Sequence, residues 1–186
     1  MPRDAGCSAQ RVGLTSSTII GIDPGLVDTG YGVVDVSGSR VRLVEAGLVR
    51  TTSSHPVEVR LREIFEGVLA LMSEHHPTAV VVEDLYTSYR HPRTAVLMGH
   101  ARGVILLAAG SRGIEVVSYP PARVKKALAG RGTASKEQIQ RMVQVTLGLD
   151  EVPEPDHVAD ALALALCHYN FLTHTMTKGS RLEGFV

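Results

Sequence analysis

The sequence predicts an α/β fold in which a mixed five-stranded sheet carries helices on both faces. Three strand-like segments follow one another within residues 18–50, which is typical of antiparallel strands joined by short turns. After them, apolar strand-like runs alternate with helical patterns, as expected of parallel strands joined by crossover helices. The chain has 186 residues, of which 44% are hydrophobic. We therefore expect one main domain around a single core.

The first half of the chain supplies four of the five strands. "TIIGID" is a β-branched run that ends before a glycine-rich turn at Pro24-Gly25, and "GYGVVDV" and "RVRLVEAGLVR" follow as further strands. Apolar residues then recur at helical spacing in residues 55–76, and Pro77 ends that helix. "TAVVVEDLY" is almost continuously apolar, which favours a strand buried on both faces.

The second half adds the last strand and four helices. We expect a helix from Pro92 to Ser111 and a strand at residues 114–119. Pro120-Pro121 then opens a short basic helix, "ARVKKALAG". Ser135 is placed to cap the helix "SKEQIQRMVQVTLGL", and a final helix begins near Asp156.

The expected domain covers residues 18–174, with tails at residues 1–17 and 175–186. The first tail lacks the apolar stretch of a secretory signal. The longest apolar region, "TAVLMGHARGVILLAAG", is interrupted by His100 and Arg102, so no membrane segment is expected. Two cysteines suggest neither a disulfide framework nor a cysteine metal site, and a reducing, cytoplasmic location is expected.

Formal net charge is zero, but the charge is unevenly distributed along the chain. Residues 86–146 contain ten lysines and arginines against two glutamates, an excess of eight positive charges. The remainder is correspondingly acidic. This division indicates one basic surface for a polyanion and an acidic site elsewhere, as in enzymes that act on nucleic acid. A merely solvated basic surface is the simpler alternative.

Three carboxylates occupy comparable places at the ends of elements. Asp23 ends the first strand, Glu83 ends the buried strand, and Asp160 lies in the first turns of the last helix. Asp23 alone could be a turn residue, a phosphate-loop residue or a metal ligand. A carboxylate at the end of an apolar strand is desolvated, which is unfavourable unless a cation or hydrogen bonds compensate. Oxygen ligands favour Mg²⁺ or Mn²⁺, and two such ions can clamp both oxygens of a phosphodiester displacement.

Two neighbours on the last helix compete for a fourth position in this site. His157 lies three residues before Asp160 and Asp156 lies four before it, so both share its helix face. A neutral imidazole could bind metal or move a proton. Asp156 follows Pro155 at a helix start, where an aspartate usually caps backbone N–H groups. Asp84 points away from Glu83 if the strand persists, so it is expected to be a solvated turn residue.

Aromatic and basic residues are interleaved in "EDLYTSYRHPR". Tyr86 and Tyr89 can stack on unpaired bases while Arg90 and Arg93 hold phosphates. The alternative is that the tyrosines pack against a neighbouring helix.

Taken together, these motifs resemble the RuvC family of bacterial Holliday junction resolvases, whose fold is ribonuclease H-like. The resemblance covers nearly all of residues 18–174, and its motifs occur in the family's order and spacing. They are "IIGIDPGLVDTGYGVV", "AVVVEDLY", "MGHARGVILLA", "SYPPARVKKALAGRGTASKEQIQRMV" and "HVADALALALCH".

The resemblance implies a metal-dependent endonuclease that acts as a symmetric homodimer on four-way DNA junctions. Each subunit would nick one of two opposed strands and leave religatable 5′-phosphate and 3′-hydroxyl ends. The family also implies docking onto the RuvA–RuvB branch-migration complex. The helix containing Gly99 and Gly103 is similar to the family's dimer-interface helix.

The resemblance also implies roles for individual residues. Asp23, Glu83 and Asp160 match the family's acids. His157 stands at a position that is often an aspartate, so it is either a metal ligand or a proton-transfer group. Tyr86 is similar to an aromatic residue near the junction centre. DNA contacts are thus expected from Tyr86, Arg93, Lys125 and Lys136.

Two other readings compete with this one. Actin-like kinases and ATPases also place Asp, Gly and Thr after a first strand, but they need two lobes to enclose a nucleotide. A junction-binding protein that has lost catalysis is the non-enzymatic alternative. The presence of Asp23, Glu83, His157 and Asp160 in one frame argues against it.

Overall fold

The fold is built on a five-stranded mixed sheet, as the sequence predicts. A computed structural model describes residues 16–84 and 92–182, with side chains from 94 to 174 in the second range. The strands lie in the order β3-β2-β1-β4-β5. β1 pairs antiparallel with β2, and β2 with β3, while the β1–β4 and β4–β5 pairs are parallel. The strands are β1 Ser17–Asp23, β2 Asp28–Ser37, β3 Arg40–Arg50, β4 Ala79–Glu83 and β5 Glu115–Tyr119.

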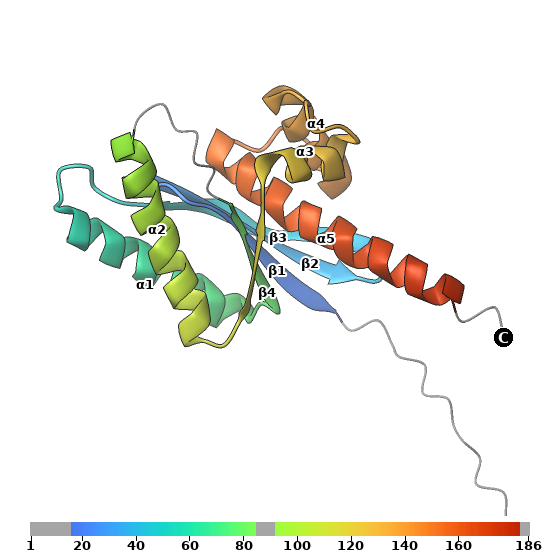
Figure 1. The fold of residues 1–186 in the computed structure, drawn as a ribbon, viewed down its shortest axis with the longest axis horizontal. Helices are drawn as coiled ribbons and strands as arrows, with labels where there is room; N and C mark the ends of the chain where they lie inside the picture. The colour runs from blue at the N-terminus through green and yellow to red at the C-terminus, as the bar shows by residue number, and fades with distance from the viewer. Residues whose placement is uncertain (1–15, 85–91, 183–186) are drawn as a thin grey trace, which may run out of the picture.

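Helices cover both faces of this sheet (Figure 1). In Figure 1, α1 and α2 lie on one side and α3, α4 and α5 on the other. The expected start of the last helix is confirmed, but that helix continues to Leu182, into the segment expected to be a tail. The helices are α1 Val57–His75, α2 Pro92–Ser111, α3 Pro121–Ala129, α4 Lys136–Leu147 and α5 Asp156–Leu182.

Alternate residues of the central strands separate two hydrophobic clusters. Ile19 packs into the cluster that contains Leu162 and Leu166 of α5. Its neighbour Ile20 faces the opposite side, in the cluster that contains Ile64 of α1. Successive side chains of a strand point to opposite faces, so an apolar run serves both clusters. The central strands are therefore buried on both sides, and their ends are fixed in position.

Close packing of α5 on β1 and β2 depends on glycine. A Cβ atom at Gly21 would lie 2.0 Å from the carbonyl oxygen of Ala161, and one at Gly30 would lie 2.1 Å from that of His157. Gly30 pairs with Asp23 across the β1–β2 ladder. Gly21 and Gly30 therefore lie in the strands β1 and β2, where the lack of a side chain lets α5 pack closely. The turn itself is Pro24-Gly25. As a result, the start of α5 sits beside the end of β1.

The expected cap of α4 is confirmed. Ser135 accepts a hydrogen bond from the backbone N–H of Gln138, and the Gln138 side chain accepts one from the Ser135 backbone, which forms a capping box. This cap fixes the first turn of α4, which begins at Lys136. The lysine is thereby held at the end of a well-defined helix.

One segment, Thr94–Ser111 of α2, is long and apolar enough to cross a membrane by length and composition alone. The core helix of a folded domain can have the same length and composition. Ala101, Ile105 and Ala108 of this segment are fully buried in the fold, and Arg102 interrupts it. Its buried face makes α2 a packed helix of the domain, while its other face is exposed.

Candidate active site

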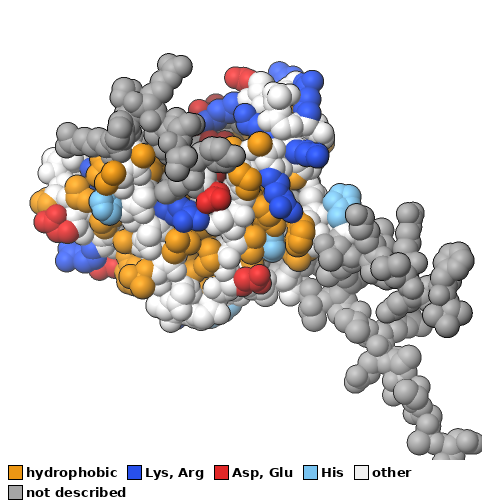
Figure 2. All heavy atoms as spheres, viewed as in Figure 1, with side chains coloured by type: hydrophobic (Ala, Val, Ile, Leu, Met, Phe, Trp, Pro, Cys, Tyr) orange, Lys and Arg blue, Asp and Glu red, His pale blue; other side chains and the backbone are white. Residues whose placement is uncertain are grey.

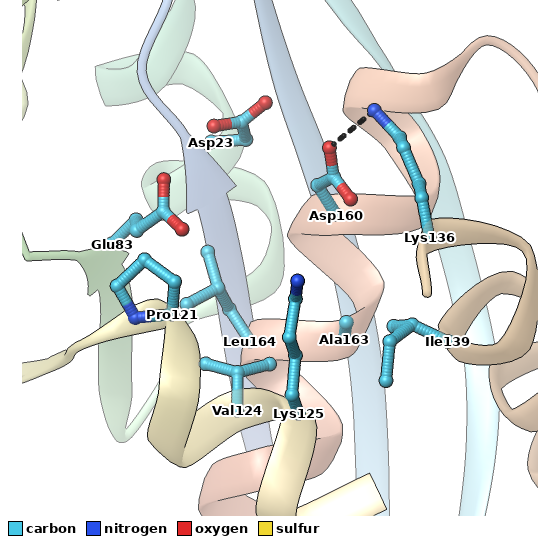
Figure 3. A pocket seen from close by; sticks show the side chains of 10 residues that line it. All are labelled: Asp23, Glu83, Pro121, Val124, Lys125, Lys136, Ile139, Asp160, Ala163 and Leu164. Carbon is cyan, nitrogen blue, oxygen red and sulfur yellow. Dashed lines mark ion pairs between the residues drawn. The ribbon is translucent and has the colours of Figure 1, made fainter. Parts of the chain in front are cut away.

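A cavity at one edge of the sheet brings together the three predicted carboxylates. Asp23 and Glu83 end the neighbouring parallel strands β1 and β4, so their side chains emerge at the same edge. Asp160 reaches the cavity from the second turn of α5 (Figure 3). The lining is completed by Pro121, Val124, Lys125, Lys136, Ile139, Ala163 and Leu164.

Asp23 is the most deeply buried of the three, with 8% of the residue exposed. Its Oδ2 atom lies 2.6 Å from Nδ1 of His157. Burial raises the pKa of Asp23 above its ordinary value, and the hydrogen bond and charge of His157 only partly offset this effect. His157 is therefore in direct contact with the first acid.

Glu83 carries the strongest perturbation of the site. Burial raises its pKa to about 7, and the negative charges of Asp23 and Asp160 add to this effect. Lys125 and Lys136 lower the pKa of Glu83 by a smaller amount. A carboxyl group with so strongly raised a pKa beside two other acids makes this cavity a candidate cation site.

Lys136 bridges two carboxylates of α5. Its Nζ atom lies 3.1 Å from Oδ2 of Asp160 and 3.1 Å from Oδ2 of Asp156. Partial burial lowers the pKa of Lys136, but the hydrogen bonds and charges of these two aspartates outweigh it and raise the pKa. The same lysine thus belongs both to the cavity and to the α4–α5 contact.

Asp156 lies outside the cavity lining. Its Oδ1 atom accepts a hydrogen bond from Nε2 of Gln140, 2.8 Å away, and its other oxygen faces Lys136. Asp156 therefore does not act as the expected helix cap. Its carboxylate turns toward α4, where both of its oxygens have partners. Asp156 links α4 to α5, and His157 takes the position beside Asp23.

The turn after Asp23 is braced by a residue that sequence reasoning missed. Arg60, 9% exposed, donates from Nε to Oγ1 of Thr51 at 3.0 Å and from Nη2 to the carbonyl of Leu26 at 2.9 Å. Thr51 also donates to the Leu26 carbonyl at 2.6 Å. The signal in the sequence was an arginine one helical turn before Ile64, on the buried face of α1. A buried cation bound to a turn keeps that turn in one conformation.

Other predicted residues divide between positions beside the site and positions that the structure leaves out. Asp84 is exposed and lies 3.7 Å from Arg102, which confirms that it is a surface residue. Figure 3 shows Lys125 pointing from α3 toward the acids. Tyr86, Tyr89 and Arg90, and the side chain of Arg93, lie outside the described residues.

The donor set fits a hard divalent metal. Carboxylate oxygens with an imidazole nitrogen are ligands for Mg²⁺ or Mn²⁺. Burial and the repulsion between neighbouring acids raise the pKa values of Asp23 and Glu83, and a bound cation would relieve both effects. Within the described ranges, one group of three side chains has potential ligand atoms that all lie within 4.8 Å of one another. This group is Glu45, Glu74 and His75, away from the cavity. There, Glu45 already accepts a hydrogen bond from Tyr31 and is bonded to His75.

Together these features define a class of protein: a nuclease-type hydrolase with a ribonuclease H-like fold, an acidic site at the sheet edge and lysines beside it. A family model described as "Crossover junction endodeoxyribonuclease RuvC" matches residues 19–168. The chain belongs to this family of crossover junction endodeoxyribonucleases.

Individual relatives and structures agree with this assignment. The RuvC of Rhodopirellula baltica is 49% identical over 156 residues, covering 83% of this chain and 88% of that protein. The RuvC of Desulforamulus reducens is 41% identical over 165 residues, covering 89% and 99%. A structure of Thermus thermophilus RuvC in complex with a Holliday junction substrate is 40% identical, with a TM-score of 0.81 over 86% of this chain and 96% of that one. The yeast mitochondrial Holliday junction resolvase, at 13% identity and a TM-score of 0.58, shares the fold.

Proposed function

We propose that this protein resolves four-way DNA junctions by paired, symmetric nicks, with Asp23, Glu83 and Asp160 as catalytic acids and His157 beside them. The observation that carries the proposal is the convergence of three carboxylates and two lysines on one cavity. Carboxylates there can hold the metal, and the lysines can hold a phosphate. The Thermus thermophilus relative is described in complex with a Holliday junction, which supports the same substrate.

The metal is proposed to be Mg²⁺, with Mn²⁺ as a substitute and two ions per site. Asp23, Glu83, Asp160 and His157 are the residues that would hold it. When bound, such ions polarise the scissile phosphate and lower the pKa of an attacking water. Displacing the Lys136 ammonium from Asp160 would leave that carboxylate available as a ligand.

His157 is proposed to act as a ligand or as a proton carrier. The His157 side chain is 47% exposed, while its Nδ1 is held by the Asp23 side chain, of which 11% is exposed. A half-exposed imidazole anchored by a buried carboxylate has a fixed orientation and can still exchange protons with water. Lys125 and Lys136 are proposed to contact the DNA backbone next to the cut, because both line the cavity from the side opposite Glu83 and Asp23 (Figure 3).

A homodimer through α2 is proposed as the working form. The exposed face of α2 is a stripe of Val96, His100, Gly103, Leu107 and Gly110, spaced alternately by four and three residues. Val96 is 58% and Leu107 61% exposed, and a Cβ atom at Gly103 or Gly110 would meet nothing within 4 Å. Large apolar side chains beside glycines make a surface onto which a second helix can pack closely. Gly99 lies at the edge of the same stripe.

Dimer symmetry suits the reaction. A four-way junction presents two opposed strands related by a two-fold axis, so a C₂ dimer offers each strand one active site. The proposed products are nicked duplexes with 5′-phosphate and 3′-hydroxyl ends that a ligase can seal. The proposed setting is the cytoplasm, with the RuvA–RuvB complex as a partner.

Cleavage of a synthetic four-way junction tests this function. With Mg²⁺ or Mn²⁺, the purified protein is expected to nick opposed strands at symmetric positions and to leave linear duplex largely intact. Asp23→Asn is expected to bind the junction and not cut it, whereas a purely structural junction binder would be indifferent to that change and to the metal. Binding without cleavage by the wild-type protein, or equal cutting of linear duplex, would overturn the proposal.

A further inference from the structure

The outer side of α3 holds an arginine between two aromatic rings. The Cζ atom of Arg123 lies 5.2 Å from the ring centre of Tyr119 and 5.7 Å from that of Phe171. Tyr119 is 4% exposed, and its hydroxyl lies 2.9 Å from Nδ1 of the buried His168. The ring beneath the guanidinium is therefore fixed. An exposed arginine held this way is oriented before any ligand arrives.

Lys126 adds a second cation on the same side. It lies three residues after Arg123 on α3, so both side chains share a helix face. Both residues are exposed, and both line a groove between α3 and α5 that also includes Asn170 and Phe171. Among the described side chains, neither cation forms an ion pair with a carboxylate, in contrast to Lys136. Two uncompensated, neighbouring cations make a site for a phosphate.

This groove is separate from the active-site cavity but close to it. Lys125 of α3 lines the cavity with the acids, while Arg123 and Lys126 line the groove, so the helix divides two basic surfaces. Figure 2 shows Lys and Arg side chains gathered over the end of the molecule where α3 and α4 lie. Along α5, Asp160 and Asn170 are about 15 Å apart at ~1.5 Å per residue. At ~3.4 Å per nucleotide of duplex, that is four to five nucleotides.

We propose that Arg123 and Lys126 form a second phosphate-binding site, which holds the backbone of the duplex arm four to five nucleotides from the cut. The inference rests on the proposed function and names a further part of its DNA contact surface. The groove favours DNA over an acidic peptide because its cations share a helix with Lys125 at the active site. The arm that leaves the active-site cavity would pass within reach of the groove.

Neutral phosphates test the site directly. Junctions are made with uncharged methylphosphonate linkages at the fourth and fifth positions on either side of the cut, and their affinity is measured in Ca²⁺ to prevent cleavage. The wild-type protein is expected to bind the neutral junction several-fold more weakly than the natural one. The double variant Arg123→Gln/Lys126→Gln is expected to bind both junctions equally, because it has no cation left to bind those phosphates.

Salt dependence gives an independent measurement. The slope of log Kd against log salt is expected to fall by about 0.9 for each phosphate that the variant no longer neutralises. The control is Arg42→Gln/Arg62→Gln, which removes the same charge from two exposed arginines already paired with Asp35 and Glu66. That control is expected to keep the wild-type slope and the wild-type response to neutral linkages. Thermal unfolding of both double variants is measured as well, and each is expected to be folded.

The outcomes separate this inference from the proposed function. If the wild-type protein fails to cut a junction, the proposed function fails. If it cuts but Arg123→Gln/Lys126→Gln keeps the full response to neutral linkages, the second phosphate site is wrong. Binding of a polyglutamate peptide that depends on Arg123, with unchanged junction affinity, would assign the groove to a protein partner and overturn the inference.

Discussion

The ammonium of Lys136 lies 3.1 Å from the carboxylate of Asp160, inside the candidate active site. The lysine thus neutralises the Asp160 carboxylate, which is proposed to be a metal ligand. Its side chain is 45% exposed and comes from the first residue of α4, so it can turn toward a phosphate when the carboxylate takes a metal. We therefore propose that this pair connects metal binding to DNA contact.

Lys136→Gln is expected to reduce junction cleavage about tenfold or more, because it removes the proposed phosphate contact next to the reacting group. Its effect on the free energy of unfolding is expected to be about 0–1 kcal/mol, since both members of the ion pair are substantially exposed. Single-turnover cleavage and chemical denaturation measure the two effects. Arg62→Gln is the control; a rate equal to that control would remove Lys136 from the site.

Glu83→Gln and Asp84→Asn form a matched pair of neighbouring substitutions. Glu83 lines the cavity, whereas Asp84 is exposed beside Arg102. Glu83→Gln is expected to lower the cleavage rate by at least a hundredfold and to preserve junction binding, because it removes a proposed metal ligand without a change in size. Asp84→Asn is expected to cut within about twofold of wild type. Comparable rates for the two variants would contradict the assignment of Glu83.

The stability of the metal-free protein is expected to fall as pH rises toward neutrality. The pKa of Glu83 is about 7 in the folded protein, against an ordinary value of 4.5, so the folded state binds more protons between these values. Unfolding is then favoured as pH rises through that window, by roughly 1–2 kcal/mol after allowance for partial exposure. Thermal unfolding in EDTA from pH 4.5 to 8 measures this trend.

Glu83→Gln is the control for this pH dependence, and it is expected to flatten the profile. Mg²⁺ affinity is expected to rise through pH 7 as Glu83 loses its proton, because a ligand must be deprotonated to bind. Calorimetric titration at pH 6 and 8 measures that affinity. A metal-free profile that is the same for wild type and Glu83→Gln would show that Glu83 does not titrate in this range.

His157 and Asp156 can be distinguished by substitution. His157→Ala is expected to reduce cleavage at least tenfold, because it removes the group bonded to Asp23, and His157→Asp is expected to recover part of the activity as an oxygen ligand. Asp156→Asn, which alters the α4–α5 contact alone, is expected to retain most activity. Cleavage rates in Mg²⁺ and Mn²⁺ test this order, and a greater loss for Asp156→Asn would reverse the assignment.

The sequence was sufficient to predict the sheet and the three acids because both depend on local patterns. Apolar runs ending in Asp23 and Glu83 identify strands whose ends meet, and helical spacing places His157 and Asp160 on one face. It could not decide between His157 and Asp156, which lie on the same helix face. Their difference comes from α4, whose Gln140 and Lys136 hold Asp156 away from the cavity.

Other features required the three-dimensional arrangement itself. The strand pattern includes Gly21 and Gly30 but does not show why they are glycines, and the structure shows that they let α5 approach the sheet. Arg60 contacts a turn more than thirty residues away in sequence. Arg123 of α3 lies against the rings of Tyr119 from β5 and Phe171 from α5. Because the three residues come from different elements, no periodic pattern in the sequence predicts this contact. Long-range packing, unlike periodicity, leaves only a weak trace in a single sequence.

Disruption of the α2 stripe is expected to separate the proposed dimer. Leu107→Glu places a charge within this exposed face and is expected to weaken self-association at least tenfold, because the carboxylate would be desolvated in the interface. Sedimentation velocity measures the monomer fraction. Val145→Glu is the control, since Val145 is 74% exposed on α4, away from the stripe.

Loss of the dimer is also expected to uncouple the two nicks. A supercoiled plasmid carrying an extruded cruciform is linearised when both strands are cut in one binding event, and nicked when one is cut. Leu107→Glu is therefore expected to give mainly nicked circles, while Val145→Glu gives the linear product of the wild type. A Leu107→Glu protein that remains dimeric and yields linear product would place the interface elsewhere than α2.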